Sequence, residues 1–322
     1  MRIAIIGGTA FIGFTSAAEL AARGHELCFV HRGQREPDDL APGQHVHVID
    51  RNDLGSVREE LERFGPDVMW DNMALTGAHA RTALDTLGDG VRIVVTSSMD
   101  VYQAYTGVQD GRALEPLPID ESSPVRDERY PYRGKIAGMD DYEKLDVEEV
   151  YLARGATVLR LPMVYGARDT QRREDFILRR VRAGRTRIPV GSGTWLAAKG
   201  WVDDVARGIV LAIEQDHPGE VFNLGESRTY PMGAWAQMVL GAAGSDAELV
   251  RVPDDALPGD LAMTGVMPQH LLVDSSKARR ALGWTDTPAV DTLRATVAWH
   301  LAHPPEATGD DFSEDDRALA ES

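Results

Sequence analysis

Residues 3–13 of the chain read IAIIGGTAFIG, an apolar run that leads directly into a glycine-rich turn. An apolar run without polar alternation is typical of a strand that is buried on both faces of a parallel sheet. From Phe11 to Arg23 the apolar residues recur with helical spacing, and Gly24 supplies a left-handed stop. The stretch therefore predicts a buried strand, a tight glycine turn and a helix, in that order.

This order is the context that a dinucleotide-binding turn requires. Gly7 allows the tight turn, Gly13 allows close packing of helix on strand, and helix amides hold the pyrophosphate. A third glycine is common at position 10; the methyl of Ala10 is tolerated if its backbone dihedrals are ordinary. A plain strand–helix turn is the alternative, whereas a P-loop is excluded because no Gly-Lys-Ser/Thr follows. We expect cofactor contacts from Gly7, Thr9, Ala10, Phe11, Ile12 and Gly13.

Strand-like and helical stretches continue to alternate along the first hundred residues. The strand-like runs are ELCFVH (26–31), HVHVID (45–50), DVMWD (67–71) and VRIVVTSS (91–98), with helices expected over 54–64 and 77–87. Helical crossovers of this length join parallel strands. The sequence predicts an α/β fold, a Rossmann-type doubly wound parallel sheet.

The end of the second strand bears on the choice of dinucleotide. An NAD site usually has an acidic residue there, which accepts hydrogen bonds from the ribose hydroxyls. This chain has His31, Arg32 and Gly33 instead. Because an arginine can pair with a 2′-phosphate, we favour NADP, with NAD as the alternative. A solvated arginine at a strand end is the other interpretation of Arg32.

The composition narrows the class of protein. The 322 residues carry a formal net charge of −17, and such an acidic surface repels the phosphate backbone of nucleic acids. No apolar run approaches the roughly 20 residues that cross a bilayer, and the N-terminal run is too short for a signal peptide. The single cysteine, Cys28, lies in a strand-like run and fits a buried position in a cytoplasmic protein. The histidines show no metal-ligand spacing.

Residues 103–139 and the C-terminal tail depart from this regular alternation. The segment 103–139 is rich in Pro, Gly, Asp and Tyr without a lasting period, which is typical of a functional loop or lid. Regular structure resumes with a helix over 141–154 and the strand TVLRL (157–161). Further helices are expected over 170–183, 204–215, 232–244 and 290–300, with short strands such as EVFNL (220–224) between them. The acidic, breaker-rich tail favours disorder, with a docked tail as the alternative.

These patterns suggest two interlocked domains. We expect a dinucleotide-binding domain over residues 1–165 together with about 201–224. A smaller C-terminal substrate-binding lobe would comprise residues 166–200 and 225–302, followed by the tail at 303–322.

The chain resembles the extended and atypical short-chain dehydrogenase/reductases, the NAD(P)-dependent epimerase/dehydratase family, over roughly residues 1–300. The resemblance rests on GGTAFIG (7–13), IDRND (49–53), TSSMDVY (96–102), LRLPMVYG (159–166), WVDDVA (201–206), FNLG (222–225) and DSSKARRALGW (274–284). GGTAFIG and DVMWDNMA (67–74) also resemble an atypical branch that includes chloroplast stem-loop RNA-binding proteins, a role that the acidic charge argues against. The resemblance implies cofactor contacts from Asp50, Arg51, Met73 and Ala74, and a homodimer through the helices at 77–87 and 141–154.

The resemblance also implies a catalytic set. In this family a Ser or Thr binds the substrate oxygen, a tyrosine transfers the hydroxyl proton, and a lysine four residues later lowers the tyrosine pKa and binds the nicotinamide ribose. Ser98 matches the hydroxyl and Lys144 matches the lysine. Asp100 lies on the same face of the strand as Ser98 and is a possible acid/base. Tyr102 ends the same motif and is placed at the substrate, although packing is its alternative role.

The tyrosine position is where the chain departs from the family. Asp140 stands four residues before Lys144, and Tyr142 lies two residues before it. On a regular helix Tyr142 would be about 200° away from Lys144. Asp140 can replace the tyrosine, or the helix can begin late so that Tyr142 turns inward, or Tyr130 or Tyr132 can enter. A site in which neither Asp140 nor Tyr142 is catalytic is the remaining alternative.

The substrate lobe concentrates arginines between residues 168 and 187. In the sugar-nucleotide branch of the family, arginines in this region meet the substrate diphosphate, so Arg172 and Arg173 are candidates. A solvated helix is the alternative, because acidic residues are interleaved. Trp195 and Lys199 are further candidates for substrate binding.

Three functions remain open at this stage. The first is an NADP- or NAD-dependent oxidoreductase or epimerase acting on a hydroxylated small molecule, such as a nucleotide sugar or a natural-product intermediate. The second is a non-redox isomerase or lyase on the same fold. The third is a catalytically silent dinucleotide-binding protein.

Overall fold

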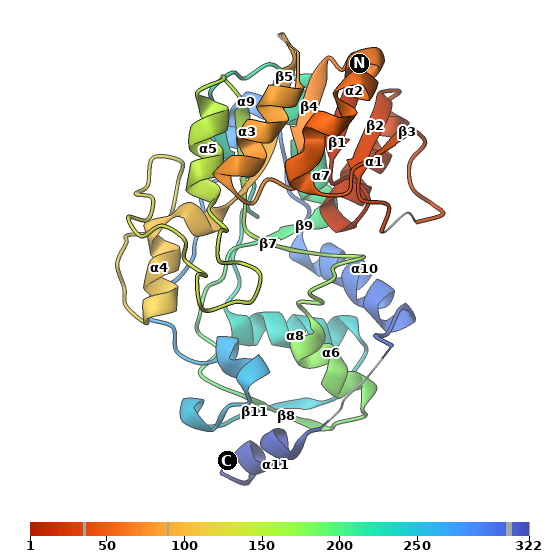
Figure 1. Ribbon diagram of the computed structural model, residues 1–322. Coiled ribbons are helices and arrows are strands. Elements are labelled where there is room, and N and C mark those ends of the chain that lie inside the picture. Colours follow the sequence, from red (N-terminus) through yellow and green to blue (C-terminus); the bar gives the residue numbers. More distant parts are fainter. Residues whose placement is uncertain (35–36, 89, 307–310, 322) are drawn as a thin grey trace.

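A seven-stranded parallel sheet forms the centre of the molecule in the computed structural model, which describes residues 1–34, 37–88, 90–306 and 311–321 (Figure 1). Its strand order is β10-β6-β5-β4-β1-β2-β3. The strands are β1 (Arg2–Ile6), β2 (Glu26–His31), β3 (Gln44–His47), β4 (Val68–Asp71), β5 (Arg92–Ser98), β6 (Thr157–Leu161) and β10 (Val221–Asn223). All neighbouring strands run parallel, which confirms the predicted doubly wound α/β fold.

Helices cover both faces of this sheet. On one face, α1 (Phe11–Ala22), α7 (Val202–Glu214) and α9 (Ser276–Leu282) share a core with the strands. On the other face lie the 3₁₀ helix η1 (Arg51–Val57), which continues into α2 (Arg58–Phe64), and the helices α3 (Gly77–Thr86) and α5 (Lys144–Leu152). The central strands are therefore buried on both sides, as their unbroken apolar runs require.

A second lobe lies beyond the carboxyl ends of the strands (Figure 1), and it has a hydrophobic core of its own. It joins α6 (Asp175–Arg182), α8 (Met232–Ala242) and α10 (Ala289–Ala302) with the parallel pair β8 (Arg187–Val190) and β11 (Glu248–Arg251). The pair β7 (Met163–Tyr165) and β9 (Lys199–Trp201) lies between this lobe and the sheet, and the short helices η3 (Asp254–Ala256) and η4 (Gly259–Thr264) belong to the lobe's chain segment.

The predicted limits of the lobe need a correction at α9. Residues 225–302 were expected to lie entirely in the substrate lobe. Helix α9 instead contacts α7 and β10, and the side chains of Leu282 and Trp284 are buried in the core of the sheet. The chain therefore returns to the first domain before α10 enters the lobe.

Two helices begin or occur where the sequence did not place them. The segment 103–139 contains α4 (Gln103–Asp110), which ends at Gly111 with a positive φ of 65°. Helix α6 begins at Asp175 rather than near residue 170, because Arg168 and Arg172 adopt positive φ angles of 65° and 44°. These angles are incompatible with a right-handed helix.

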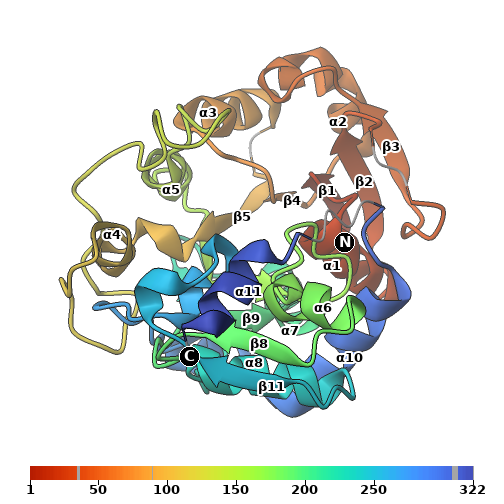
Figure 2. The ribbon, with the colours of Figure 1, turned by 90° about the horizontal axis from the view of Figure 1, so that it is seen from below.

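The expectation of a disordered tail is wrong for residues 313–320. They form α11 (Ser313–Ala320), which lies across β8 (Figure 2). Asp315 is buried against the guanidinium of Arg180, and the ring of Phe312 lies beneath Arg179. These contacts explain why an acidic, polar segment is held in place. Residues 307–310 and 322 of the predicted tail lie outside the described residues.

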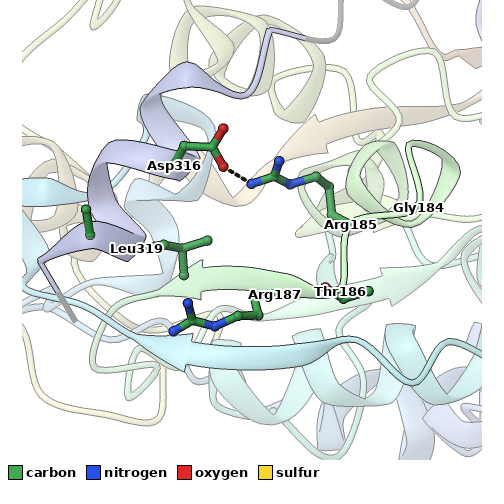
Figure 3. Close-up of a pocket in the computed structure, with 7 residues that line it drawn as sticks. Gly184, Arg185, Thr186, Arg187, Asp316 and Leu319 are labelled. Carbon is green, nitrogen blue, oxygen red and sulfur yellow. Dashed lines mark hydrogen bonds and ion pairs between the residues drawn. The ribbon is translucent and has the colours of Figure 1, made fainter.

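The docked tail forms one side of an open pocket of about 470 Å³ beside β8. Figure 3 shows its lining: Gly184, Arg185, Thr186, Arg187, Asp316, Leu319 and Ala320. An ion pair between Arg185 and Asp316 spans it.

None of the helices in the described part of the chain has the length and apolar character to cross a bilayer.

Candidate active site

The sheet order reverses beside β1, and the segments that follow β1, β4 and β5 all start from the same edge. In open α/β sheets, ligands bind at such a switch point, outside the carboxyl ends of the strands. The glycine turn follows β1, Met73 and Ala74 follow β4, and Ser98 ends β5. The fold therefore gathers the predicted cofactor and catalytic segments at one edge.

The glycine turn has the geometry that the sequence predicts. Gly7 has a φ of 85°, and a Cβ atom on Gly13 would lie 2.4 Å from the Gly7 carbonyl oxygen, so helix and strand pack in direct contact. Ala10 has ordinary extended dihedrals, φ −145° and ψ 149°, so its methyl group is tolerated. Neither an acidic residue in the first turn nor a capping side chain occupies the N-terminus of α1. The turn fits an anionic dinucleotide.

The groups at the ends of β2 and β3 also fit a dinucleotide. Arg32 is exposed, and its charge acts on the carboxylate of Asp50, whose pKa is lowered mainly by hydrogen bonds from Asn52. Arg51 forms an ion pair with the fully buried Asp71, yet its Nε and Nη1 atoms are buried without a partner among the described residues. Buried donors of this kind need an acceptor, which a bound ligand can supply.

Lys144 lies at the same edge of the sheet. It is the first residue of α5, and its Nζ atom donates to the carbonyl oxygens of Ala74, at 2.6 Å, and Thr96, at 3.0 Å. Burial lowers the pKa of Lys144, whereas the charges of Asp71 and Asp100 oppose this shift. The ammonium group is therefore fixed between the ends of β4 and β5, where the resemblance places the lysine that binds the nicotinamide ribose.

The late start of α5 resolves the spacing of Tyr142. Glu143 is the N-cap, with φ −155° and ψ 96°, so Tyr142 precedes the helix. The separation of about 200° from Lys144 holds only for residues on a regular helix and does not apply to Tyr142. The Tyr142 hydroxyl donates to Asp100 Oδ2 at 2.8 Å, and the Tyr132 hydroxyl donates to the same atom at 3.0 Å. Two of the predicted arrangements thus occur together. We call Ser98, Asp100, Tyr132 and Tyr142 the Asp100 cluster.

Asp140 lies outside this cluster. Its side chain is exposed, and its carboxylate accepts a hydrogen bond from the Gly134 amide at 2.9 Å. The turn that precedes α5 directs Asp140 toward residues 133 and 134 rather than toward the sheet. Of the two replacements for the missing tyrosine, the structure brings Tyr142 to the site and leaves Asp140 at the surface.

A buried ion pair holds the Asp100 cluster together. Arg126 donates to both oxygens of Glu143, at 2.8 and 2.6 Å, and its Nε atom donates to the Asp100 carbonyl at 3.1 Å. Glu143 also accepts from the Tyr130 amide. These two residues tie the irregular segment to the start of α5 and were missed from the sequence, where no periodic or motif signal links position 126 to position 143.

The electrostatics of the Asp100 cluster differ from those of a tyrosine activated by lysine. Burial raises the pKa of Asp100, although hydrogen bonds from Tyr142 and Tyr132 oppose the shift. Burial and the Asp100 charge raise the pKa of Tyr142 well above its usual value, with Ser98 acting in the opposite direction. Tyr142 is therefore a neutral phenol that donates to a carboxylate. The second oxygen of Asp100, Oδ1, is buried without a partner.

Ser98 is partly exposed at the end of β5, whereas Tyr102 is buried within the protein. The Ser98 hydroxyl oxygen accepts from the Asp100 amide at 3.2 Å, and the side chain is partly exposed. Tyr102 is fully buried, its hydroxyl donates to Asn223, and the guanidinium of Arg160 lies over its ring. The placement of Tyr102 at the substrate is corrected to its alternative, a packing role.

The lobe residues proposed for substrate binding are engaged within the protein. Arg172 bonds to Asp175 and to two backbone carbonyls, and Arg173 bonds to both oxygens of Asp169. The buried Trp195 donates its indole N–H to the Gln269 carbonyl. Arg172 has a positive φ of 44°, and its guanidinium faces α6 and α10, where it donates to Asp175 and to the His300 carbonyl. The solvated-helix alternative is also wrong for Glu174, which is buried.

Lys199 lies in a group of buried charges that the sequence did not reveal. Its Nζ atom donates to the Ala197 carbonyl at 3.1 Å, and burial lowers its pKa to about 8. Nearby, burial and the charge of Asp169 raise the pKa of Glu174 to about 8, and burial raises that of Glu226 to about 7. No group of three or more possible metal ligands occurs in the described ranges of the chain.

The fold and the site define a class: a doubly wound dinucleotide-binding protein with a lysine, a serine and a tyrosine at the carboxyl ends of its strands. The comparison with protein families agrees. The model of the NAD dependent epimerase/dehydratase family matches residues 3–225, and the chain belongs to this family. It is an NAD(P)-dependent enzyme of the short-chain dehydrogenase/reductase superfamily.

Characterised relatives differ widely in what they do. The chain is 26% identical to a UDP-glucose 4-epimerase of Corynebacterium glutamicum, over 93% of this chain and 95% of the relative. It is 25% identical to a 4-hydroxy-2-methyl-3-oxo-4-farnesyl-3,4-dihydroquinoline-1-oxide ketoreductase of Stigmatella aurantiaca, covering 91% and 96%. It is also 25% identical to the chloroplast stem-loop binding protein of 41 kDa b of Arabidopsis thaliana, covering 88% and 74%.

Solved structures share the fold at lower identity. A UDP-glucose 4-epimerase structure superposes with a TM-score of 0.72 at 16% identity, covering 95% of this chain and 99% of the other. A second, from Stenotrophomonas maltophila with bound NAD and formylated UDP-arabinopyranose, has a TM-score of 0.71 at 18% identity, covering 94% and 98%. At these identities the likeness establishes the architecture.

Proposed function

We propose that the protein is an NAD(P)-dependent oxidoreductase or epimerase that acts at a carbinol or carbonyl carbon of a hydroxylated small molecule. The observation that carries this proposal is the hydrogen bond between Tyr142 and Asp100, at the same edge of the sheet as Lys144. It supports Tyr142, one of the alternatives that the sequence left open, as the proton-transfer group.

The dinucleotide would be held by the glycine turn at its pyrophosphate and by Lys144 at its nicotinamide ribose. A bound nicotinamide supplies or accepts the hydride. The unpartnered Nε and Nη1 atoms of Arg51 support a ligand with acceptor groups beyond β3. We favour NADP because Arg32 offers a cation, and no carboxylate ends β2.

Asp100 and Tyr142 would move the proton as a pair. During oxidation of a substrate hydroxyl, its proton passes to the Tyr142 oxygen while Tyr142 passes its own proton to Asp100 Oδ2. Reduction of a carbonyl reverses both transfers. Because burial raises the pKa of Asp100, its protonated form is more accessible near neutral pH than that of an ordinary aspartate. Ser98 would donate its hydroxyl proton to the substrate oxygen.

A second candidate, non-redox acid–base chemistry, is favoured by one observation. Asp100 Oδ1 is buried and unpartnered, so this carboxylate can act on a ligand directly, without hydride transfer. The role named for the chloroplast relative is not proposed here, because a net charge of −17 repels nucleic acid.

The test begins with mass spectrometry of small molecules released from the purified, denatured protein, followed by titration with NAD, NADP and their reduced forms. We expect dinucleotide binding that Lys144→Ala weakens, and redox turnover that Tyr142→Phe and Ser98→Ala reduce. Absence of any dinucleotide, bound or added, would sink the proposal. Dinucleotide binding with chemistry that leaves the nicotinamide unchanged throughout would favour the second candidate.

A further inference from the structure

Two phenols meet on a single oxygen of Asp100. Its Oδ2 atom accepts hydrogen bonds from the hydroxyls of Tyr142, at 2.8 Å, and Tyr132, at 3.0 Å. The centroids of the two rings lie 5.2 Å apart, so the phenols also contact each other. One phenol is sufficient to exchange a proton with a substrate oxygen. The presence of a second phenol on the same carboxylate therefore calls for a role of its own.

The two phenols differ in their exposure to solvent. Tyr142 is 8% exposed and lies two residues before Lys144, on the side of the cofactor. Tyr132 is partly exposed, and it belongs to the irregular segment that precedes α5. Asp100, which is 7% exposed, lies between them. A continuous chain of hydrogen bonds thus runs from the buried phenol, through a buried carboxylate, to a phenol at the surface.

The turn that carries Tyr132 is held in place on both sides. Before it, the Tyr130 amide donates to the buried carboxylate of Glu143 at 2.6 Å. After it, the Gly134 amide donates to the carboxylate of Asp140 at 2.9 Å. Asp140 stands where the family keeps its tyrosine, and here it fixes the turn that brings another tyrosine to Asp100. A group that is held in this way pays little conformational entropy to remain at its partner.

We infer that Tyr132 is a further catalytic residue, which passes protons between the reacting oxygen of Asp100 and solvent. The inference rests on the proposed function and adds the exit route for the proton. During oxidation, the proton that leaves Tyr142 forms an O–H bond at Asp100 Oδ2. That bond breaks as its proton moves to the Tyr132 oxygen, while the Tyr132 hydroxyl gives its own proton to a solvent water. Reduction of a carbonyl runs the same transfers in reverse.

This route has a consequence for the type of reaction. Oxidation of a carbinol releases one proton in addition to the hydride, and reduction of a carbonyl consumes one. A net oxidoreductase must therefore exchange a proton with solvent in every turnover. An epimerase that returns the hydride to its substrate also returns the proton, so it needs no such route. The second phenol favours net oxidation or reduction over epimerisation.

The electrostatic surroundings allow Asp100 to hold a proton in transit. Burial raises its pKa, and four neighbouring groups oppose this shift: Tyr142, Arg126, Tyr132 and Lys144. The charge of Arg126 is paired with that of Glu143, which leaves Asp100 only partly compensated. A carboxylate in this state can accept a proton and release it again near neutral pH.

Infrared spectroscopy of the full chain after a rapid pH jump tests the inference without a substrate. A protonated carboxyl has a carbonyl band of its own, and the loss of a band in Asp100→Asn assigns that band to Asp100. We expect Tyr132→Phe to slow the appearance of the band by about 10²-fold, the lower end of what a positioned proton-transfer group contributes. The substitution retains the ring and its packing, so the fold should be preserved.

Two tyrosines of the same region provide matched controls. Tyr142→Phe removes one hydrogen bond from the same oxygen, so it should raise the Asp100 pKa in the same sense as Tyr132→Phe. It leaves the solvent side of the route intact, and the band should therefore appear close to the wild-type rate. Tyr130→Phe, whose hydroxyl bonds to Asp146, should alter neither the rate nor the pKa of Asp100. Equal rates for Tyr132→Phe and Tyr142→Phe, or no Asp100 band at any pH at which the protein is folded, would overturn the inference.

Turnover provides a second measurement. Glucose, myo-inositol, glucosamine and UDP-glucose are offered as substrate probes with NAD or NADP, and nicotinamide absorbance is followed. We expect Tyr132→Phe to lower the steady-state rate but not the rate of hydride transfer in the first turnover, because that turnover can leave its proton on Asp100. Equal losses in both rates would make Tyr132 a structural or substrate-binding residue, contrary to the inference. Absence of dinucleotide binding or of any redox turnover would count against the proposed function instead, since the infrared measurement depends on neither.

Discussion

Helix α6 and its N-cap carry two buried ionisable side chains with opposite surroundings. Arg180 is fully buried, and its guanidinium makes five hydrogen bonds, to Phe176, Asp260 and Asp315. Glu174, at the start of the same helix, is equally buried and has no partner for either oxygen. The hydrogen-bonding capacity of Arg180 is met within the protein, whereas that of Glu174 is not met among the described residues. Buried charges whose hydrogen bonds are all made within the protein stabilise the lobe, whereas a buried group without a partner costs free energy unless water or a ligand bonds to it.

Asp100 belongs with Glu174 in this comparison, since one of its oxygens is unpartnered. Asp100→Asn removes the proton acceptor of Tyr142 but keeps the shape of the side chain. We expect turnover to fall by about 10²–10⁴-fold, the contribution typical of general acid–base catalysis. The measurement is hydride transfer, followed by nicotinamide absorbance, with the substrate probe that binds best.

The same variant should not be less stable than the wild type at neutral pH. Burial raises the Asp100 pKa, so the charged form destabilises the folded state, and the amide removes this penalty. Asp110→Asn, in an exposed ion pair with Arg112, is the control and should retain full activity. Unaltered turnover in Asp100→Asn would assign proton transfer to another group.

Arg180→Met removes the buried guanidinium whose hydrogen bonds are all made within the protein. Asp315 then remains buried with its charge uncompensated, and removal of one partner from a buried ion pair typically costs about 3–5 kcal/mol. Urea unfolding should show this loss in the free energy of unfolding. Arg294→Met, which removes an exposed ion pair with Asp291, should stay within about 0.5 kcal/mol of the wild type. A loss below about 1 kcal/mol for Arg180→Met would contradict the role assigned to the docked tail.

Local patterns were sufficient to predict much of the fold. The unbroken apolar runs predicted the buried strands, the helical crossovers predicted their parallel order, and the turn from Gly7 to Gly13 predicted the strand–helix junction. Each of these features depends on neighbouring residues or on a conformational demand specific to glycine. The lysine of the site, Lys144, was identified from resemblance and lies at the predicted edge.

The remaining features depend on pairs of residues far apart in sequence. The start of α5, and with it the position of Tyr142, depends on Glu143 and Arg126, which are 17 residues apart. The tail is held by Arg180 and Asp315, separated by 135 residues. The composition of the tail indicated disorder. Composition does not reveal which arginine elsewhere in the chain pairs with an aspartate of the tail. Arg172 was expected at the substrate from the family resemblance, which does not reveal that its guanidinium pairs with Asp175.

The pH dependence of stability provides a third test of the comparison. The pKa of Glu174 is raised from 4.5 to about 8 by burial and by Asp169. Its stabilising contribution is therefore complete below the unfolded pKa and is lost as the pH rises through about 8. Glu174→Gln does not titrate, so its advantage over the wild type should grow between about pH 5 and pH 8, by on the order of 3 kcal/mol.

Urea unfolding at several pH values measures this difference. Lys199, whose pKa is lowered to about 8, changes stability mainly above that pH and is common to both proteins, as is Glu226. Glu62→Gln, at the exposed site on α2, should run parallel to the wild type. If Glu174→Gln also runs parallel, Glu174 has a partner in solution and is not an unsaturated group.

The smallest effect is expected at Arg32, where the charge is exposed rather than buried. Arg32→Gln removes a cation that can pair with the 2′-phosphate of NADP, and solvent and salt screen that interaction. We expect the affinity for NADP to fall about tenfold, or about 1.4 kcal/mol, with that for NAD changing less than about twofold. Fluorescence titration at two salt concentrations measures both, and Arg63→Gln, exposed on α2, is the control. Because exposed charges are screened and buried ones are not, raising the salt should shrink the Arg32 effect and leave the Arg180 effect intact. Equal losses for both dinucleotides would show that Arg32 does not select between them.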